Sequence, residues 1–197
     1  GGTSYALRGN KNHEPSAIWA HLLPVINLLK EKCPEVKRLH FFSDGPSSQY
    51  RQKKNFFLLN YFTTELGFDE TTWNFSESGH GKGVADGIGG SVKRTLDKNV
   101  SYGRDITNGK EAFEILKSVS KRIQFFYINE SEIKSVQDKL PIVQKAVPGT
   151  MQVHYIVVAG SLQIQHRVLS CFCRIGREHI CECFAIKKTL SHQRYCY

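Results

Sequence analysis

Hydrophobic residues recur at every third or fourth position in several stretches of the chain, a spacing that is typical of amphipathic helices. The first stretch begins after Asn12, an expected helix cap, and has Pro15 in its first turn. Pro24 lies inside this stretch and predicts a kink or a break, because an interior proline costs a helix about 3 kcal/mol. The spacing predicts helices at about residues 18–29, 56–66, 84–96 and 108–119.

Short apolar runs between these stretches predict β-strands. The run at 37–43 contains Leu39, Phe41 and Phe42 and predicts a buried strand. Further strands are expected at residues 5–7, 71–75 and 123–128, and a hairpin at 151–158 and 162–171. The alternation of strands and helices predicts an α/β sheet with helical crossovers. We expect a boundary near residue 148, which would divide the chain into segments 1–148 and 149–197.

Composition and charge narrow the classes of function. Hydrophobic residues make up 40% of the chain and aromatic residues 11%, which is enough for a packed core. The formal net charge is +9, from 27 basic and 18 acidic residues, and it favours nucleic acid as a partner over a merely solvated basic surface. No apolar run approaches the roughly 20 residues of a membrane span, and no signal peptide is evident. We therefore expect a soluble intracellular or nuclear protein with no membrane partner, and the pattern leaves its oligomeric state open.

Two acidic residues occupy distinctive positions. Asp44 ends the strand predicted at 37–43, and Asp86 lies in the glycine-rich segment 79–90, where a helix is expected to begin. A carboxylate that leaves a strand and another that opens a helix are the ligands that a divalent-metal phosphoryl-transfer site needs. The sequence therefore predicts a candidate catalytic pair, Asp44 and Asp86, that binds Mg²⁺ or Mn²⁺.

These residues and their surroundings resemble a known family. Ser43-Asp44-Gly45, the residues 49–51 at a helix start and the segment 79–90 are similar to the second and third acid motifs of DDE/D transposases and retroviral-type integrases. They also resemble a group of transposon-derived animal proteins, and the likeness covers about residues 5–98. It implies a ribonuclease H-like three-layer core, with its first strands missing here, and phosphoryl transfer on DNA. Asp44 and Asp86 would hold one or two metal ions that activate the attacking water or 3′-hydroxyl.

Basic residues near the two acids are candidate phosphate contacts. They are Lys82, Lys93, Arg94 and Arg51. Lys93 and Arg94 return near the face of the second acid two helical turns along, although a solvated basic helix end is an alternative. His80 is a candidate to protonate a leaving group or orient a water, and a purely hydrogen-bonding loop histidine is the alternative.

Three glycines follow the second acid within about one turn, at positions 87, 89 and 90. Each glycine inside a helix costs roughly 1 kcal/mol relative to alanine, so their presence needs a reason. One reason is that a backbone without side chains lets a phosphodiester approach closely. The alternatives are a tight contact between helix and sheet, or a helix that begins only after Gly90. A P-loop is excluded, because Gly83 stands where that motif needs Ser or Thr.

The first acid of the ribonuclease H-like pattern has no counterpart in the chain. The only acid before residue 30 is Glu14, whose place at a helix start suits a dipole or capping role. The chain begins Gly1-Gly2 without methionine, which suggests a fragment whose first acid lies upstream. The alternative is a domesticated, inactive nucleic-acid-binding protein, so enzyme activity stays uncertain.

Cysteines are concentrated near the end of the chain and form two Cys-x-Cys pairs. On facing strands such pairs can complete a Cys₄ zinc site, here Cys171, Cys173, Cys181 and Cys183. The spacing partly resembles the SWIM zinc finger, with His179 and His192 as substitute ligands. Free thiols are the alternative, while disulfides fit poorly without a signal peptide. The cluster predicts a small zinc-like appendage and adds a third hypothesis, a zinc-dependent protein-interaction module.

Overall fold

The computed structural model describes residues 3–7, 14–44, 50–76, 84–120, 123–142, 153–159, 163–167 and 193–194. The chain divides into two compact units. Unit 1 comprises Gly1–Glu35 and Lys82–Pro141, and unit 2 comprises Val36–Gly81 and Ile142–Tyr197. The units are thus interleaved along the chain, whereas the sequence predicted two consecutive segments, 1–148 and 149–197.

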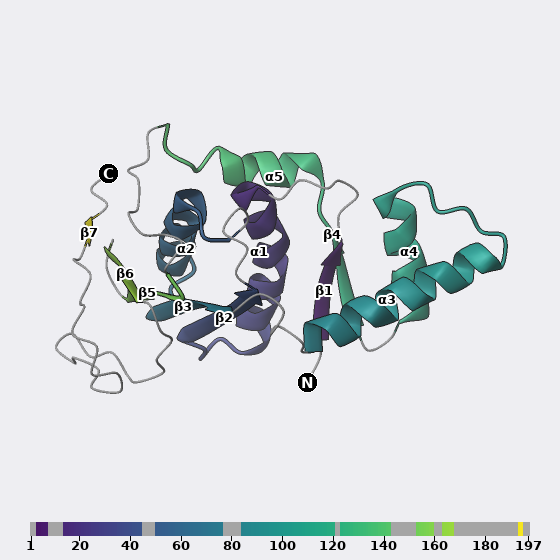
Figure 1. Cartoon of the computed structure of the whole chain (residues 1–197), viewed down its shortest axis with the longest axis horizontal. Coiled ribbons are helices and arrows are strands. Elements are labelled where there is room, and N and C mark those ends of the chain that lie inside the picture. Colours follow the sequence, from purple (N-terminus) through teal and green to yellow (C-terminus); the bar gives the residue numbers. More distant parts are fainter. Residues whose placement is uncertain are drawn as a thin grey trace. The chain divides into compact units, whose positions relative to one another are not determined.

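Unit 1 combines helices with a two-stranded parallel sheet (Figure 1). Its strands are β1 (Thr3–Leu7) and β4 (Ile123–Tyr127), which pair from Thr3 opposite Ile123 to Leu7 opposite Tyr127. Its helices are α1 (Pro15–Lys32), α3 (Val84–Ser101), α4 (Gly109–Val119) and α5 (Glu130–Gln137). Helix α1 packs against β1 and α5, while α4 packs against β4 and α3. The predicted strands at 5–7 and 123–128 and the predicted helices of this unit are confirmed.

Helix α1 departs from the sequence prediction in two details. The predicted cap at Asn12 is wrong, because Glu14 holds the N-cap position and Pro15 follows it as the first helical residue. Pro24 does not break the helix, which continues for 18 residues. The fold compensates for the missing N–H of Pro24 by burying one side of the helix, with Trp19 and Ile26 in the core.

Helices α3 and α4 meet β4 in a small hydrophobic core. Val92, Leu116 and Phe125 are buried at its centre. Ile88 and Leu96, four residues on either side of Val92 in α3, pack against this centre, as the four-residue spacing predicted. Only one stripe of α3 is therefore used for packing within unit 1.

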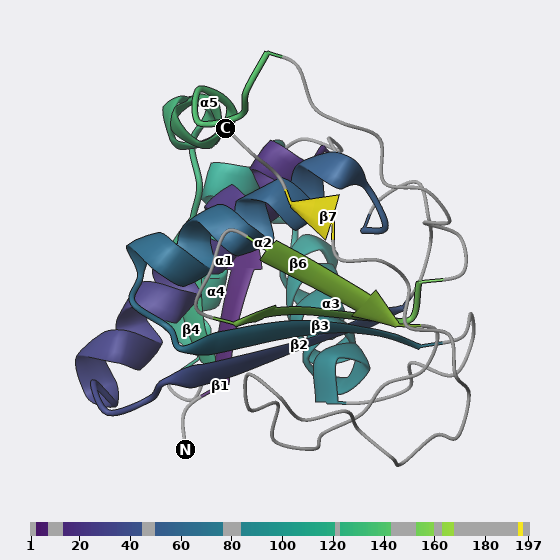
Figure 2. The ribbon, with the colours of Figure 1, turned by 90° about the vertical axis from the view of Figure 1, so that its left-hand side faces the viewer.

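Unit 2 is built on a mixed sheet with the strand order β2-β3-β5-β6-β7. The strands are β2 (Arg38–Asp44), β3 (Glu70–Ser76), β5 (Tyr155–Ala159), β6 (Gln163–Arg167) and β7 (Gln193–Arg194). Strands β2 and β3 are parallel, and every other neighbouring pair is antiparallel. Helix α2 (Lys53–Glu65) lies across the sheet and packs against β3, β5 and β6 (Figure 2).

The predicted hairpin is confirmed as β5 and β6, and it belongs to the sheet rather than to an appendage, because β5 pairs with β3. The predicted burial of the first strand of this sheet is wrong. Strand β2 lies at the sheet edge, and the side chain of Phe42 is 68% exposed. Strand β3 is an interior strand instead, and Thr72, Trp73 and Asn74 are all buried on it.

These two units establish a mixed α/β fold, as the sequence predicted. Among the described residues, none of the helices is apolar over a length sufficient to cross a bilayer.

Candidate functional site

Asp44 is the last residue of β2 and lies opposite Ser76, the last residue of β3. Because the two strands are parallel, both carboxyl ends meet at one edge of the sheet, the edge at which open α/β sheets bind ligands. Two hydrogen bonds hold Ser43, the residue before Asp44, one through its side chain and one through its backbone. The indole N–H of Trp73 donates to the Ser43 hydroxyl oxygen at 3.0 Å, and the Ser76 hydroxyl donates to the Ser43 carbonyl oxygen at 3.3 Å.

An aromatic cluster stands beside this strand end. The Trp73 ring lies 5.3 Å from Phe41, 5.8 Å from Tyr50 and 5.9 Å from Phe75, measured between ring centroids. The guanidinium of Arg51 lies over the Phe75 ring, 5.4 Å from its centroid. Arg51, which precedes the N-cap residue of α2, is thus held against an aromatic face. Its predicted role as a phosphate contact stays a prediction.

Asp86 lies in the first turn of α3, and its side chain is exposed. A carboxylate at this position interacts favourably with the helix dipole, which is a structural reason for an acid there. Asp44 belongs to unit 2 and Asp86 to unit 1. The sharing of one cation by the two acids therefore stays a prediction.

Packing against the described residues does not account for the glycines of α3. Helix α3 begins at Val84, so the alternative of a helix that starts after Gly90 is wrong. A β-carbon placed on Gly87 or Gly89 would meet no described atom within 4 Å, which also removes the alternative of a tight contact there. A β-carbon on Gly90 would lie 3.4 Å from Nη1 of Arg94, so that side chain folds back over the bare backbone.

Basic side chains occupy the outer face of α3. Lys93 and Arg94 are exposed, and neither forms an ion pair with a carboxylate of the described residues. Lys98 is also exposed, and its ammonium lies 5.8 Å from the ring centroid of Tyr102. Sequence reasoning missed Lys98 and Tyr102. Their spacing of four residues, continued from Arg94, is the signal that would have found them.

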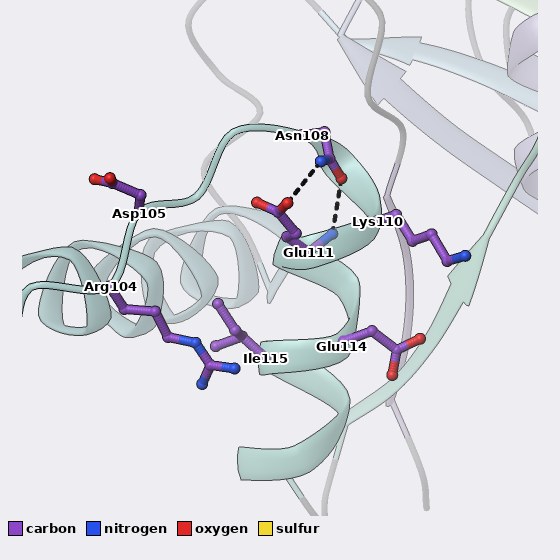
Figure 3. A pocket seen from close by; sticks show the side chains of 7 residues that line it. All are labelled: Arg104, Asp105, Asn108, Lys110, Glu111, Glu114 and Ile115. Carbon is purple, nitrogen blue, oxygen red and sulfur yellow. Dashed lines mark hydrogen bonds between the residues drawn. The ribbon is translucent and has the colours of Figure 1, made fainter.

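A polar depression lies beside the connection between α3 and α4 (Figure 3). It has a volume of about 460 Å³ and is lined by Arg104, Asp105, Asn108, Lys110, Glu111, Glu114 and Ile115. These residues supply three carboxylates and two cations, so the depression does not favour an anion.

Glu111 has a structural role in this depression. The backbone N–H of Thr107 donates to its carboxylate at 2.8 Å, and the Thr107 hydroxyl donates at 3.0 Å. These bonds, followed by weaker ones from Asn108, lower the pKa of Glu111 below its ordinary value, because they favour the charged form. In return, the Asn108 side chain accepts from the Glu111 backbone N–H, which caps α4 as the sequence predicted (Figure 3).

The structure does not describe some of the predicted site residues. Lys82 and His80 lie outside the described residues, and so do the zinc candidates Cys171, Cys173, Cys181 and Cys183. Among the residues that are described, no three His, Cys, Asp or Glu side chains gather as a metal site would require. Zinc binding stays a prediction.

The fold and the outer face of α3 together define an α/β protein with an exposed basic helix. Residues 4–170 match a protein family described as a domain of unknown function (DUF8701), and the chain belongs to that family. Neither the curated proteins nor the solved structures include a match.

Proposed function

We propose that this chain is a DNA-binding domain of the DDE/D transposase type, with a ribonuclease H-like core, that acts on phosphodiester bonds with Mg²⁺ or Mn²⁺. The proposal gives Asp44 and Asp86 the role of metal ligands. It is supported by their positions, since one ends a parallel strand and the other opens the helix that follows the next strand. Carboxylate oxygens are the ligands that these hard cations prefer. When bound, such a cation polarises the scissile phosphate and lowers the pKa of a water molecule.

The observation that carries the proposal is the outer face of α3. Asp86 is exposed there beside Gly87, around which the described residues leave open space. Lys93 and Arg94 follow about two turns further along. A face with a carboxylate, bare backbone and exposed cations suits a polyanion that must come close to a metal ligand, and packing among the described residues does not explain it.

Manganese binding tests the metal role directly. Mn²⁺ is titrated into the full chain and the free ion is measured by electron paramagnetic resonance. We expect Asp44→Asn and Asp86→Asn to weaken binding strongly, because each removes an anionic ligand. Asp97→Asn is the matched control, since Asp97 is an exposed carboxylate of the same helix and has no role in the proposed site. If Mn²⁺ bound both site variants as tightly as it binds the parent, the proposed metal site would be ruled out.

A second candidate function is DNA binding without catalysis, which is supported by the exposed cations Lys93 and Arg94 and needs no metal ligand. Cleavage of a labelled DNA oligonucleotide in Mn²⁺ separates the two functions. Catalysis predicts products that disappear in Asp86→Asn, whereas the binding function predicts binding with no products. Both predict that affinity falls steeply as salt rises, because phosphate contacts release counterions. Flat salt dependence would contradict both and indicate a protein partner.

A further inference from the structure

Residues at four-residue intervals form a continuous row that winds around α3, outside its packed stripe, and ends just beyond its last residue. The row consists of Asp86, Gly90, Arg94, Lys98 and Tyr102, and we refer to it as the α3 ridge. Residues four apart are neighbours on a helix surface, about 6 Å apart along the axis, so the ridge extends for about 24 Å. Within unit 1, the packed side of the helix is formed by a different row, Ile88, Val92 and Leu96.

The far end of the ridge presents an aromatic ring. Tyr102 is 76% exposed, which is unusual for a large ring. Its position is fixed by the end of the helix. The Tyr102 N–H donates to the Asn99 carbonyl at 3.2 Å, Gly103 follows in a left-handed conformation with φ of 80°, and the Arg104 N–H donates to the same carbonyl at 3.2 Å. The ring therefore projects from a firmly terminated helix.

Charged side chains of both signs lie near the ring, with a small excess of cations. Between residues 84 and 105 the chain has four basic side chains, Lys93, Arg94, Lys98 and Arg104, and three acidic ones, Asp86, Asp97 and Asp105. Lys98 lies over the Tyr102 ring at 5.8 Å, so the ring and a cation are presented together. An aromatic face beside cations is the combination that binds single-stranded nucleic acid, with phosphates on the cations and a base on the ring.

We propose that the α3 ridge binds a single-stranded segment of polynucleotide, with Arg94 and Lys98 on phosphates and an unpaired base stacked on Tyr102. The inference rests on the proposed function and names its preferred substrate. In a duplex the bases are stacked on one another and offer no free face, so the ring distinguishes single strands from duplexes. The opposite end of the same ridge is Asp86, the candidate metal ligand.

Fluorescence anisotropy of the full chain with a labelled oligo-dT and with a duplex of equal length tests this preference. We expect Tyr102→Ala to weaken oligo-dT binding by about 5- to 150-fold, the range that one lost base stack implies. Tyr102→Phe keeps the ring and should bind nearly as the parent does. Tyr127→Ala is the control, because it removes a tyrosine that is 39% exposed on β4, outside the ridge. Duplex binding should be almost unaffected by Tyr102→Ala.

The cations on the ridge are tested by salt dependence. Arg94→Ala should reduce the slope of log affinity against log salt for oligo-dT by about 0.7, the value of one lost phosphate contact on a single strand. Lys32→Ala removes an equal charge from an exposed position at the end of α1 and should leave the slope unchanged. An equal effect of both substitutions would show attraction by the overall charge and would overturn the ridge as a specific surface.

The fluorescence of a Tyr102→Trp variant reports contact between residue 102 and the oligonucleotide, which a purely structural role of this residue would not produce. Trp19 and Trp73 are both buried, so the new indole supplies the accessible fluorescence. We expect oligo-dT to quench it, and duplex to leave it nearly unchanged. The inference would be overturned if binding were salt-sensitive but Tyr102→Ala did not change the affinity and the new tryptophan were not quenched. That result would leave the proposed function standing. Absence of binding to both nucleic acids would overturn both.

Discussion

Helices α2 and α3 each follow a strand of unit 2 along the chain, yet their sequences serve different purposes. Helix α2 has eight buried residues among its 13, including Phe56, Leu58 and Leu59. Helix α3 has 18 residues, and of the described side chains only Val92 is buried. Packing thus accounts for most of the α2 sequence, while it accounts for a single stripe of α3.

This contrast shows that the exposed residues of α3, unlike most residues of α2, are not explained by a contribution to folding stability. Gly87, Gly89 and Gly90 each lower helix stability by about 1 kcal/mol relative to alanine, a notable share of the 5–15 kcal/mol of a typical domain. No described atom stands close enough to Gly87 or Gly89 to exclude an alanine there. Gly87 lies on the outer face and weakens the helix without improving its packing against the described residues, which points to a function for that face.

The largest expected effect concerns the packed helix. Phe56→Ala should lower the free energy of unfolding by about 3–5 kcal/mol, because the Phe56 side chain is 1% exposed and its loss leaves a cavity. Urea unfolding followed by circular dichroism measures the change. Lys54→Ala, an exposed position of the same helix, should stay within about 0.5 kcal/mol of the parent. Equal effects of the two substitutions would mean that α2 is not the core helix described.

A smaller effect is expected where α4 supports α3. Asn108→Ala removes the side-chain oxygen that accepts from the Glu111 backbone N–H at 3.0 Å. Loss of a helix cap lowers stability by about 1 kcal/mol, and urea unfolding measures it. Asn108→Ser keeps an oxygen at the cap and should recover most of the loss. If serine were as damaging as alanine, capping would not be the reason for the asparagine.

The smallest predicted effect is a pH dependence in unit 2, where burial lowers the pKa of His166 on β6 below its ordinary value of 6.5. The unfolded chain therefore binds a proton more readily than the folded chain does. The free energy of unfolding keeps its full value above pH 6.5, and it decreases as the pH falls from 6.5 toward the lower pKa of the folded state. Urea unfolding at pH 7.5 and 5.5 should show this loss, and His166→Gln should reduce it. A variant with the same pH dependence as the parent would contradict the assignment to His166.

Most of the secondary structure could be predicted because it depends on local patterns. The four-residue spacing of Ile88, Val92 and Leu96 identified α3, and Asn108 with Glu111 identified the start of α4. These signals are complete within one turn or a few turns of chain.

The errors came from features that depend on distant pairing. The run around Phe42 resembles a buried strand, but burial depends on the strand order, and β2 lies at the edge. Thr72 and Asn74 look like the outward side of a strand, but β3 has neighbours on both sides and both of its faces are covered. The interleaving of the two units is likewise a matter of long-range contacts that no local pattern reveals.

The candidate site was predictable only in part. Asp44 and Asp86 were singled out because they lie at the end of a predicted strand and at the start of a predicted helix. The structure places them at the last residue of β2 and in the first turn of α3. Tyr102 was missed although it continues the four-residue spacing of Arg94 and Lys98, because the helix was predicted to end at about residue 96 and α3 extends to Ser101.

The most direct test of the central claim, that the outer face of α3 is shaped for a polynucleotide, is Gly87→Ala with Gly89→Ala as the matched control. Residues two apart on a helix do not share a face, so Gly87 lies on the outer face and Gly89 lies toward the packed row. Urea unfolding and oligo-dT binding are measured on the same preparations. We predict that unfolding becomes harder by about 1 kcal/mol in each variant, because each removes a helix glycine where the described residues leave open space. We also predict that Gly87→Ala binds oligo-dT more weakly than Gly89→Ala does, because only its methyl group stands between the outer face and the polynucleotide backbone. A more stable Gly87→Ala variant that binds oligo-dT as tightly as the parent would contradict the claim.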